Sequence, residues 1–173
     1  MTYTLRYAIK EDAPRIAAIH VESWRHGYKG IIHQAWLDHG LDISKQTERW
    51  TSRLEAGRKE TILVFDNKRL AGFVTAGPSR NENYPGYAEL YAIYIDPACY
   101  GRGAGTALFR ACVEYVINLG FGKMFVNVLK DNSAGRRFYE KMGGVHVKNS
   151  EEELSIGGRP YTEIKYVWED LKR

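Results

Sequence analysis

The segment between residues 96 and 106 constrains the fold more than any other part of the chain. It reads Asp-Pro-Ala-Cys-Tyr-Gly-Arg-Gly-Ala-Gly-Thr and lies between a strand-like apolar stretch and an amphipathic, helix-like stretch. Its glycines, Gly101, Gly103 and Gly105, allow the backbone to approach a ligand closely. The first amides of the following helix have no acceptor within it and lie at the positive end of its dipole. The segment therefore predicts a strand, a turn and a helix with a phosphate site, to which Arg102 adds a fixed charge.

The spacing of these glycines excludes two common nucleotide motifs. The dinucleotide fingerprint G-x-G-x-x-G requires a glycine where Thr106 or Leu108 stands. The P-loop requires a lysine after its last glycine, and here Gly105 is followed by Thr106. A plain connection that needs glycine only for its backbone angles is disfavoured, because a glycine within a helix costs about 1 kcal/mol. The predicted ligand therefore carries phosphate but belongs to another class.

Strand-like and helix-like patterns alternate along the rest of the chain. Strands are predicted at residues 3–9, 60–66, 70–77, 87–96, 123–129, 145–149 and 159–168. Helices are predicted from Asp12 and Pro14 onward, from a Ser44 cap to Glu55, over 104–119, and from Asn132 or Ser133 to Gly143. This order predicts an α/β (α+β) fold, in which helices cover a mixed sheet. No repeat or Pro/Ser-rich linker is present, so we expect residues 1–173 to form a single domain.

Composition and charge narrow the class of protein. With 44% hydrophobic residues and a mean hydropathy of −0.44, the chain can bury a core but has no apolar run of about 20 residues. The first four residues lack a secretory signature, so we expect a cytoplasmic protein without a membrane partner. The net charge of +4, from 25 basic and 21 acidic residues, is dispersed, which favours a small polyanion over nucleic acid. Cys99 and Cys112 lack metal-ligand spacing, and no metal is expected.

Two segments resemble the motifs of one enzyme family. Gly103, Ala104 and Gly105 fit the second half of Q/R-x-x-G-x-G/A, and Tyr100 stands at its opening position. Residues 132–143, with Asn, Ala and Tyr in place, resemble N-x-x-A/S-x-x-x-Y-x-x-x-G-F. These are the motifs of the GNAT superfamily of acetyl-CoA-dependent N-acetyltransferases. Residues 20–31 are similar to the first-helix segment of its small-molecule acetyltransferases, and the whole resemblance spans about residues 3–168.

The resemblance implies a mixed, mostly antiparallel twisted sheet of about six to seven strands with about four helices. It implies acetyl-CoA as co-substrate, with Ile93 and Ile95 against its pantetheine arm. Near these residues a splayed strand would leave amides to polarise the thioester carbonyl. The coenzyme-binding residues expected from the motifs are Ile93, Tyr94, Ile95, Tyr100, Gly101, Arg102, Gly103, Ala104, Gly105, Thr106, Asn132, Ala134, Arg136 and Tyr139.

Glu89 is the candidate catalytic base. A lysine-like amine with a pKa of about 10.4 is neutral in roughly 1 of 2,500 molecules at pH 7, so acetyl transfer benefits from a base. Glu89 interrupts the otherwise uncharged stretch 84–95, and we expect it to be half-buried with a raised pKa. By the resemblance, it lies eleven residues before the motif opens, where several members carry a catalytic glutamate. The alternative is a rim glutamate, solvated or paired with a lysine.

Tyr139 is the candidate acid, because a phenol with a pKa near 10 can protonate a leaving thiolate. The alternative is a core role, since Tyr139 follows Phe138 at helical spacing with Met142. Trp24, Tyr28 and Tyr84, with Glu89, are the candidate substrate-binding residues; core packing is the alternative for the tryptophan. Trp36 and residues 81–87 are secondary candidates for the walls of an acceptor pocket. His20 is expected to have a structural role, and Cys99 is a disfavoured nucleophile.

These features predict an N-acetyltransferase that acts on a primary amine of a small molecule by direct attack in a ternary complex. One alternative is a non-catalytic acyl-CoA-binding regulatory module. Others are an acetyltransferase for a protein N-terminus or lysine, and an acyltransferase for longer chains. The last strand, 161–168, carries alternating bulky residues and is the predicted route to a homodimer.

Overall fold

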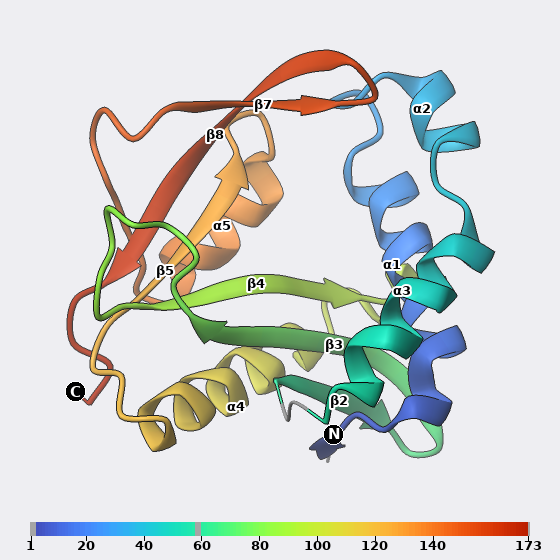
Figure 1. The fold of residues 1–173 in the computed structure, drawn as a ribbon, viewed down its shortest axis with the longest axis horizontal. Coiled ribbons are helices and arrows are strands. Elements are labelled where there is room, and N and C mark those ends of the chain that lie inside the picture. The colour runs from blue at the N-terminus through green and yellow to red at the C-terminus, as the bar shows by residue number, and fades with distance from the viewer. Residues whose placement is uncertain (1–2, 58–59, 173) are drawn as a thin grey trace. The chain divides into compact units, whose positions relative to one another are not determined.

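Five α-helices and eight strands lie within residues 3–57 and 60–172, which the computed structural model describes (Figure 1). The chain forms two compact units. Unit 1 holds residues 1–75 and 92–111, and unit 2 holds residues 76–91 and 112–173. The prediction that the chain has no secretory signal rests on its first four residues. Two of them, Met1 and Thr2, lie outside the described residues. The single-domain expectation stays a prediction.

Unit 1 packs helices against an antiparallel sheet. Its strands are β1 (Tyr3–Tyr7), β2 (Thr61–Asp66) and the first part of β3 (Arg69–Pro78), paired in that order. Its helices are α1 (Ala13–Gly27), α2 (Gln34–His39), α3 (Ile43–Glu55) and the first part of α4 (Ala104–Asn118). Helices α1 and α3 lie side by side (Figure 1). Apolar residues at helical spacing on α1, including Ile16, enter a core with Leu63 and Phe73.

Two predicted helix caps differ from the structure. Asp42 rather than Ser44 caps α3, because its Oδ1 accepts a hydrogen bond from the Lys45 amide at 2.9 Å. Asp12 precedes α1 but makes no side-chain cap bond there. Its carboxylate instead accepts hydrogen bonds from Arg6 at 2.6 and 2.8 Å and from the Ile9 amide at 2.9 Å. The charged partner outcompetes the cap amides for the same oxygens.

Unit 2 is built on β8 (Arg159–Trp168). This strand pairs antiparallel with β5 (Met124–Leu129) on one side, and with β6 (Val145–His146) and β7 (Glu152–Ile156) on the other. The start of β4 (Ala88–Ile95) pairs parallel with β5, and α5 (Ser133–Lys141) precedes β6. Because β8 has partners on both sides, it offers no free edge to a second copy, and the homodimer stays a prediction.

The hydrogen-bonded strand order is β1-β2-β3-β4-β5-β8-β6, with β7 beside β8. This confirms the predicted α/β fold with a mixed, mostly antiparallel sheet. The sequence reading missed α2 and β7, and it gave five residues to the two-residue β6. Helix α2 begins after His33 without a side-chain cap, so its start carries no sequence signal. Within residues 3–57 and 60–172, no helix is long and apolar enough to cross a membrane.

Candidate active site

The glycine-rich turn of unit 1 ends where α4 begins. Gly101 and Gly103 have φ angles of 74° and 93°, in the left-handed region that favours glycine. Nothing lies within 4 Å of a Cβ added at Gly101, so the backbone angle rather than space requires glycine there. The first helical bond joins the Ala107 amide to the Gly103 carbonyl at 3.0 Å. The amides of residues 104–106 therefore lack acceptors within the helix and can bind an anion.

Backbone contacts hold this turn in place. Asp96 Oδ1 accepts the Ala98 amide at 2.9 Å, and Asp96 Oδ2 pairs with Arg69 at 2.6 Å. The Tyr3 hydroxyl donates to the Arg102 carbonyl at 2.7 Å. The side chain of Arg102 stays exposed. Its guanidinium is thus available to a ligand while its backbone is fixed.

Tyr100, at the opening position of the turn motif, lies against the end of α1. Its ring contacts the His26 ring edge to face, with 5.3 Å between centroids. Partial burial raises the pKa of the Tyr100 phenol above its ordinary value. The side chain that replaces the expected Gln or Arg is therefore a neutral aromatic packed beside the helix.

The end of β4, residues 93–95, is half-buried in unit 1. The Tyr94 hydroxyl accepts a hydrogen bond from Trp24 Nε1 at 2.8 Å, and the Ile95 carbonyl accepts one from Ser23 Oγ at 2.8 Å. The Tyr94 side chain is therefore anchored to α1. The sequence reading missed Gly72, where an added Cβ would lie 2.6 Å from the Tyr94 carbonyl oxygen. A glycine inside a strand pattern was the available signal of this close approach.

Aromatic rings surround Trp24 on α1. Tyr28 lies edge to face with it at 4.8 Å between centroids, and Trp36 is tilted at 5.6 Å. His20 stacks on Tyr94 at 5.0 Å, which fits the structural role expected for this histidine. Burial, with a smaller contribution from the nearby Arg49 charge, lowers the pKa of His20 to about 4. The structure thus brings the candidate substrate residues Trp24 and Tyr28 together, both half-buried.

Glu89 lies on β4 in unit 2 and is 5% exposed. Its Oε1 accepts Arg80 Nη2 at 2.5 Å, and its Oε2 accepts Arg80 Nε at 3.1 Å and the Arg80 amide at 2.9 Å. The hydrogen bond with Glu89 raises the pKa of Arg80. The expectations of a half-buried side chain and of a solvated or lysine-paired alternative were both wrong. Sequence reasoning missed Arg80, because it reaches Glu89 from a loop nine residues away.

The strand register places Glu89 and Tyr139 on opposite faces of the unit 2 sheet. Glu89 is in register with Phe125 on β5, so their side chains share one face. Tyr166 is in register with Val126, on the other face, and its hydroxyl donates to Glu140 of α5 at 2.6 Å. Tyr139 on α5 is buried, with its ring 6.2 Å from that of Tyr166. Helix α5 and Tyr139 therefore cover the face opposite Glu89.

The β4 and β5 ladder that the structure describes has two residue pairs, Ala88 with Met124 and Glu89 with Phe125. Strand β5 continues to Leu129 and is paired with β8 over its whole length. The resemblance placed the splay later, near residues 93–95, which belong to unit 1. Its location stays a prediction.

Helix α5 uses its motif residues in its own structure. Asn132 caps the helix, because its Oδ1 accepts the Gly135 amide at 2.9 Å. Arg136 Nη1 donates to the Lys130 carbonyl at 3.2 Å, and its Nε donates to the Tyr166 hydroxyl at 3.3 Å. Ala134 is exposed in the first turn. These residues position the helix start, and Ala134 leaves it open to a ligand.

Gly144 stands where the family motif often has an aromatic residue. A Cβ at this position would lie 2.8 Å from Cζ2 of Trp168 and 3.0 Å from the Tyr139 carbonyl oxygen. Trp168 also donates from Nε1 to the Met142 carbonyl at 2.8 Å. The indole of Trp168 therefore occupies the space that an aromatic side chain at position 144 would need.

Tyr84 lies in the loop that covers the Glu89 face. Its ring is tilted on Phe125 at 4.7 Å and lies edge to face with Tyr87 at 5.3 Å. It also lines a cavity of about 240 Å³ together with loop residues and Phe121, whereas Glu89 is not among the lining residues. Tyr84 is half-buried, and its ring contacts attach the loop to β5. It does not enclose Glu89.

Two other predictions concern metals and thiols. Within residues 3–57 and 60–172, no group of three His, Cys, Asp or Glu side chains could hold a metal ion. Cys99 beside the turn is buried, which disfavours the alternative of a cysteine nucleophile. Burial raises the pKa of the Cys112 thiol to about 12, so this residue is inert.

Comparison with known proteins shows which family these features belong to. The family model of the Acetyltransferase (GNAT) family matches residues 15–144. An uncharacterised N-acetyltransferase, YuaI, of Bacillus subtilis (strain 168) is 34% identical over 169 residues, covering 97% of this chain and 94% of that protein. A mycothiol acetyltransferase of Rhodococcus opacus (strain B4) is 26% identical over 136 residues, and the match covers 77% of this chain but only 42% of that protein.

Solved structures show the same fold. The structure of yncA from Salmonella typhimurium with its cofactor acetyl-CoA has a TM-score of 0.73 and 19% identity, and the match covers 100% of this chain and 96% of that one. The family match, the similarity to YuaI and the shared fold agree with both sequence motifs. The chain therefore belongs to the GNAT acetyltransferase family and is an N-acetyltransferase.

Proposed function

We propose that the protein transfers the acetyl group of acetyl-CoA to a primary amine of a small molecule by direct attack, without an acetylated enzyme. The observation that carries the proposal is the turn at Gly101 and Gly103, whose positive φ angles expose the first amides of α4. A pyrophosphate fits this site, because the amides donate hydrogen bonds to its oxygens and the helix dipole favours negative charge. Acetyl-CoA bound there supplies the thioester that carries the acetyl group.

The proposed coenzyme residues follow the motifs. Residues 100–106 hold the pyrophosphate, with the Arg102 guanidinium as a fixed charge. Residues 93–95 hold the pantetheine arm through their backbone, since the Tyr94 ring is engaged with α1. The start of α5, with Asn132, Ala134 and Arg136, and Tyr139 on the same helix, face the rest of the coenzyme. No metal is part of this proposal.

Glu89 is the proposed base, and the hydrogen bonds of Arg80 define which atom acts. Oε2 accepts two hydrogen bonds from Arg80 and Oε1 accepts one. A carboxylate oxygen has two acceptor positions, so Oε1 keeps one for the amine or for a water that relays its proton. Arg80 fixes the orientation of the carboxylate and so reduces the entropy that this contact would lose.

Tyr139 is the proposed acid for the leaving thiolate. It lies on α5, on the face of the unit 2 sheet opposite Glu89. The amine nitrogen and the thiol sulfur are bonded to the same carbon in the tetrahedral intermediate, so the two proposed roles require the thioester to lie where both faces are within reach. Glu89 then serves the incoming amine and Tyr139 serves the outgoing thiol.

The acceptor is proposed to be a small amine, and its proposed contacts in unit 1 are Trp24 and Tyr28. The support is the similarity of residues 20–31 to the first helix of small-molecule acetyltransferases and the half-buried aromatic group around Trp24. Aromatic faces suit both the alkyl part of an amine and its cationic form.

Thiol release from acetyl-CoA tests the proposal. The purified chain is assayed with a panel of small primary amines, with peptides that present a free N-terminus, and with peptides that present a lysine. Release with small amines is expected. Release only with peptides would transfer the function to protein acetylation, and release only with succinyl or longer thioesters would change the donor. Thermal stabilisation by coenzyme A without release from any acceptor would support the non-catalytic binding module.

A further inference from the structure

The face of the unit 2 sheet that carries Glu89 also carries a group of charged side chains. We call it the charged face and define it by Arg80, Glu89, Asn127, Glu152, Glu163 and Lys165. Asn127 is in register with Lys165, and Glu163 is in register with Leu129 of β5 and with Glu152 of β7. Residues in register share a face, and alternate residues along a strand share it too. These side chains therefore lie on one surface of unit 2.

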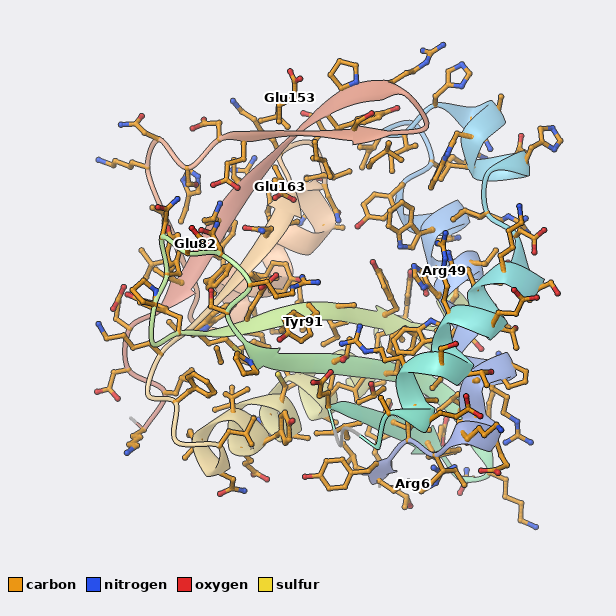
Figure 2. The ribbon with its side chains drawn as sticks, in the orientation of Figure 1. Arg6, Arg49, Glu82, Tyr91, Glu153 and Glu163 are labelled. Carbon is orange, nitrogen blue, oxygen red and sulfur yellow. The ribbon has the colours of Figure 1, made fainter. Side chains whose placement is uncertain are left out.

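Two ion pairs neutralise most of this charge. Arg80 binds Glu89 as described above, and its guanidinium lies 4.2 Å from the ring of Tyr91, which Figure 2 labels on β4. Lys165 is 1% exposed, and its Nζ lies 2.6 Å from Glu152 Oε1 without a well-directed hydrogen bond. Each cation is thus matched by one carboxylate.

Glu163 is the carboxylate that remains. It is half-buried on β8, and among the residues that the structure describes none donates a hydrogen bond to it or pairs with it. Burial raises the pKa of Glu163, the carboxylates of Glu152 and Glu89 add to the rise, and the charges of Lys165 and Arg80 oppose it. The charges that act on Glu163 are two cations and two carboxylates, so with Glu163 itself this group has one negative charge in excess; Arg159, on the same face, is exposed at the start of β8 and is not among them. A half-buried charge without a partner is costly, so this site favours a cation.

Asn127 shows a second unmet acceptor on the same face. Its Oδ1 is buried and accepts no hydrogen bond from the described part of the chain. Asn127 on β5 is the diagonal neighbour of Glu163 on β8, at a typical separation of about 7–8 Å. Both groups lack donors rather than acceptors. A ligand that satisfies them carries a positive charge and several N–H bonds, as a primary ammonium group does.

We propose that Glu163, with Asn127, binds the acceptor in its ammonium form, so that the acceptor class is alkylamines that are cationic near neutral pH. The inference deepens the proposed function and rests on it, because only that function makes the bound amine an acetyl acceptor. Glu163 has a binding role here: Glu89 is in register with Phe125 and Glu163 with Leu129, so the ammonium is held at Glu163 before it reaches Glu89, the proposed base that removes its proton. Weakly basic aryl amines, which carry no charge at neutral pH, lack the group that Glu163 binds.

The test uses n-butylammonium chloride as the probe and 1-butanol as its neutral counterpart. Backbone amide shifts of β8 are followed by NMR as each compound is added to the unaltered chain without acetyl-CoA. We expect saturable shifts at Thr162, Glu163 and Lys165 with n-butylammonium, and binding at least about tenfold weaker with 1-butanol. This comparison needs no variant, and equal binding of the two compounds, or no binding of n-butylammonium, would overturn the proposal.

Two variants assign the binding to one carboxylate. Glu163→Gln is expected to weaken n-butylammonium binding by about tenfold or more, because a charged partner is lost. Glu153→Gln is the matched control, since Glu153 is an exposed residue of the neighbouring β7, labelled with Glu163 in Figure 2. Its binding is expected to equal that of the unaltered chain. Binding to folded Glu163→Gln within twofold of the unaltered chain would contradict the assignment.

The outcome is separable from that of the proposed function. A chain that binds n-butylammonium through Glu163 but releases no thiol with any amine would disprove the proposed function and leave the cation site standing. A chain that acetylates small amines while n-butylammonium leaves the β8 amides unchanged would disprove the cation site and leave the proposed function standing.

Discussion

The Arg80 guanidinium holds both carboxylate oxygens of Glu89, with Nη2 2.5 Å from Oε1 and Nε 3.1 Å from Oε2. The two partners differ in environment, because the Glu89 side chain is 7% exposed and the Arg80 side chain 63%. The contact therefore ties a loop to the start of β4 and gives a buried carboxylate a fixed direction. Both stability and catalysis are expected to depend on it, in ways that different variants separate.

The stability of the pair is tested by a double-mutant cycle. Arg80→Met leaves the Glu89 carboxylate buried without its charged partner, and we expect it to lower the free energy of unfolding by about 1–3 kcal/mol. Adding Glu89→Gln removes the buried charge and should recover part of this loss. Urea unfolding at pH 7 of both single variants and the double variant measures the coupling. Strictly additive losses would show that the ion pair contributes nothing to folding.

The catalytic role of Glu89 predicts a loss of turnover. Glu89→Gln keeps the size of the side chain but removes the basic oxygen, so kcat is expected to fall by about 10²–10⁴-fold. The KM for acetyl-CoA should change little, because Glu89 is not among the proposed coenzyme-binding residues. Thiol release at saturating amine measures both constants. Glu114→Gln, an exposed glutamate of α4, is the control. Equal turnover of the two variants would exclude Glu89 as the base.

Local patterns predicted most of the fold because each strand and helix carries its own periodicity. Residues 104–119 and 159–168 were assigned correctly from spacing, and the turn at Gly101 and Gly103 from its glycines. Helix α2 and strand β7 were missed because they are short and depend on packing against longer neighbours. The position of β8 inside the sheet could not be predicted for a related reason, since strand order is set by contacts distant in sequence.

The residues of the candidate site also fall into those that local sequence predicts and those that depend on distant contacts. Residues whose role depends on backbone geometry, such as Gly103, could be predicted from the sequence. Residues whose role depends on a partner could not. Nothing in the sequence pairs Arg80 with Glu89, or leaves Glu163 unpaired between Glu152 and Lys165, because these relations arise only when loop and strands meet. Asn132 was recognised by its motif, and the structure adds that its oxygen caps α5.

The proposed acid role of Tyr139 predicts a loss of activity without a large loss of stability. Tyr139→Phe keeps the buried ring and removes the hydroxyl, so we expect kcat to fall by about 10²-fold while the free energy of unfolding changes by about 1 kcal/mol or less. Tyr166→Phe, on the same face, gives the contrast. It breaks the 2.6 Å hydrogen bond to Glu140 and the 3.3 Å hydrogen bond from Arg136, so it should lower stability and weaken coenzyme binding, while kcat at saturating acetyl-CoA stays within about threefold. If Tyr139→Phe and Tyr166→Phe have the same kcat, Tyr139 is not the acid.

The buried imidazole of His20 predicts a dependence of stability on pH. Its pKa is about 4 in the folded chain, because of burial and the Arg49 charge, against an ordinary value near 6.5. A lowered histidine pKa means that the unfolded chain binds the proton first. The contribution of His20 to the free energy of unfolding is therefore fully present above pH 6.5. It is lost as the pH decreases towards 4, by up to about 3 kcal/mol. Urea unfolding between pH 7 and 4.5 measures this slope. His20→Gln should flatten it, and an unchanged slope in that variant would assign it to other groups.

The glycine turn predicts a joint loss of stability and coenzyme binding. At Gly103, φ is 93°, and an alanine in the left-handed region costs about 1–2 kcal/mol. Gly103→Ala should therefore lower the free energy of unfolding by about that amount or displace the turn, and either change misdirects the amides at the start of α4. We expect coenzyme A to bind about tenfold more weakly, as measured by calorimetry. Gly122→Ala is the matched control, because its φ is not positive and no atom lies within 4 Å of an added Cβ. Coenzyme binding that is unaltered in a folded Gly103→Ala variant would place the pyrophosphate elsewhere, since the amides that carry the proposal would then be unnecessary.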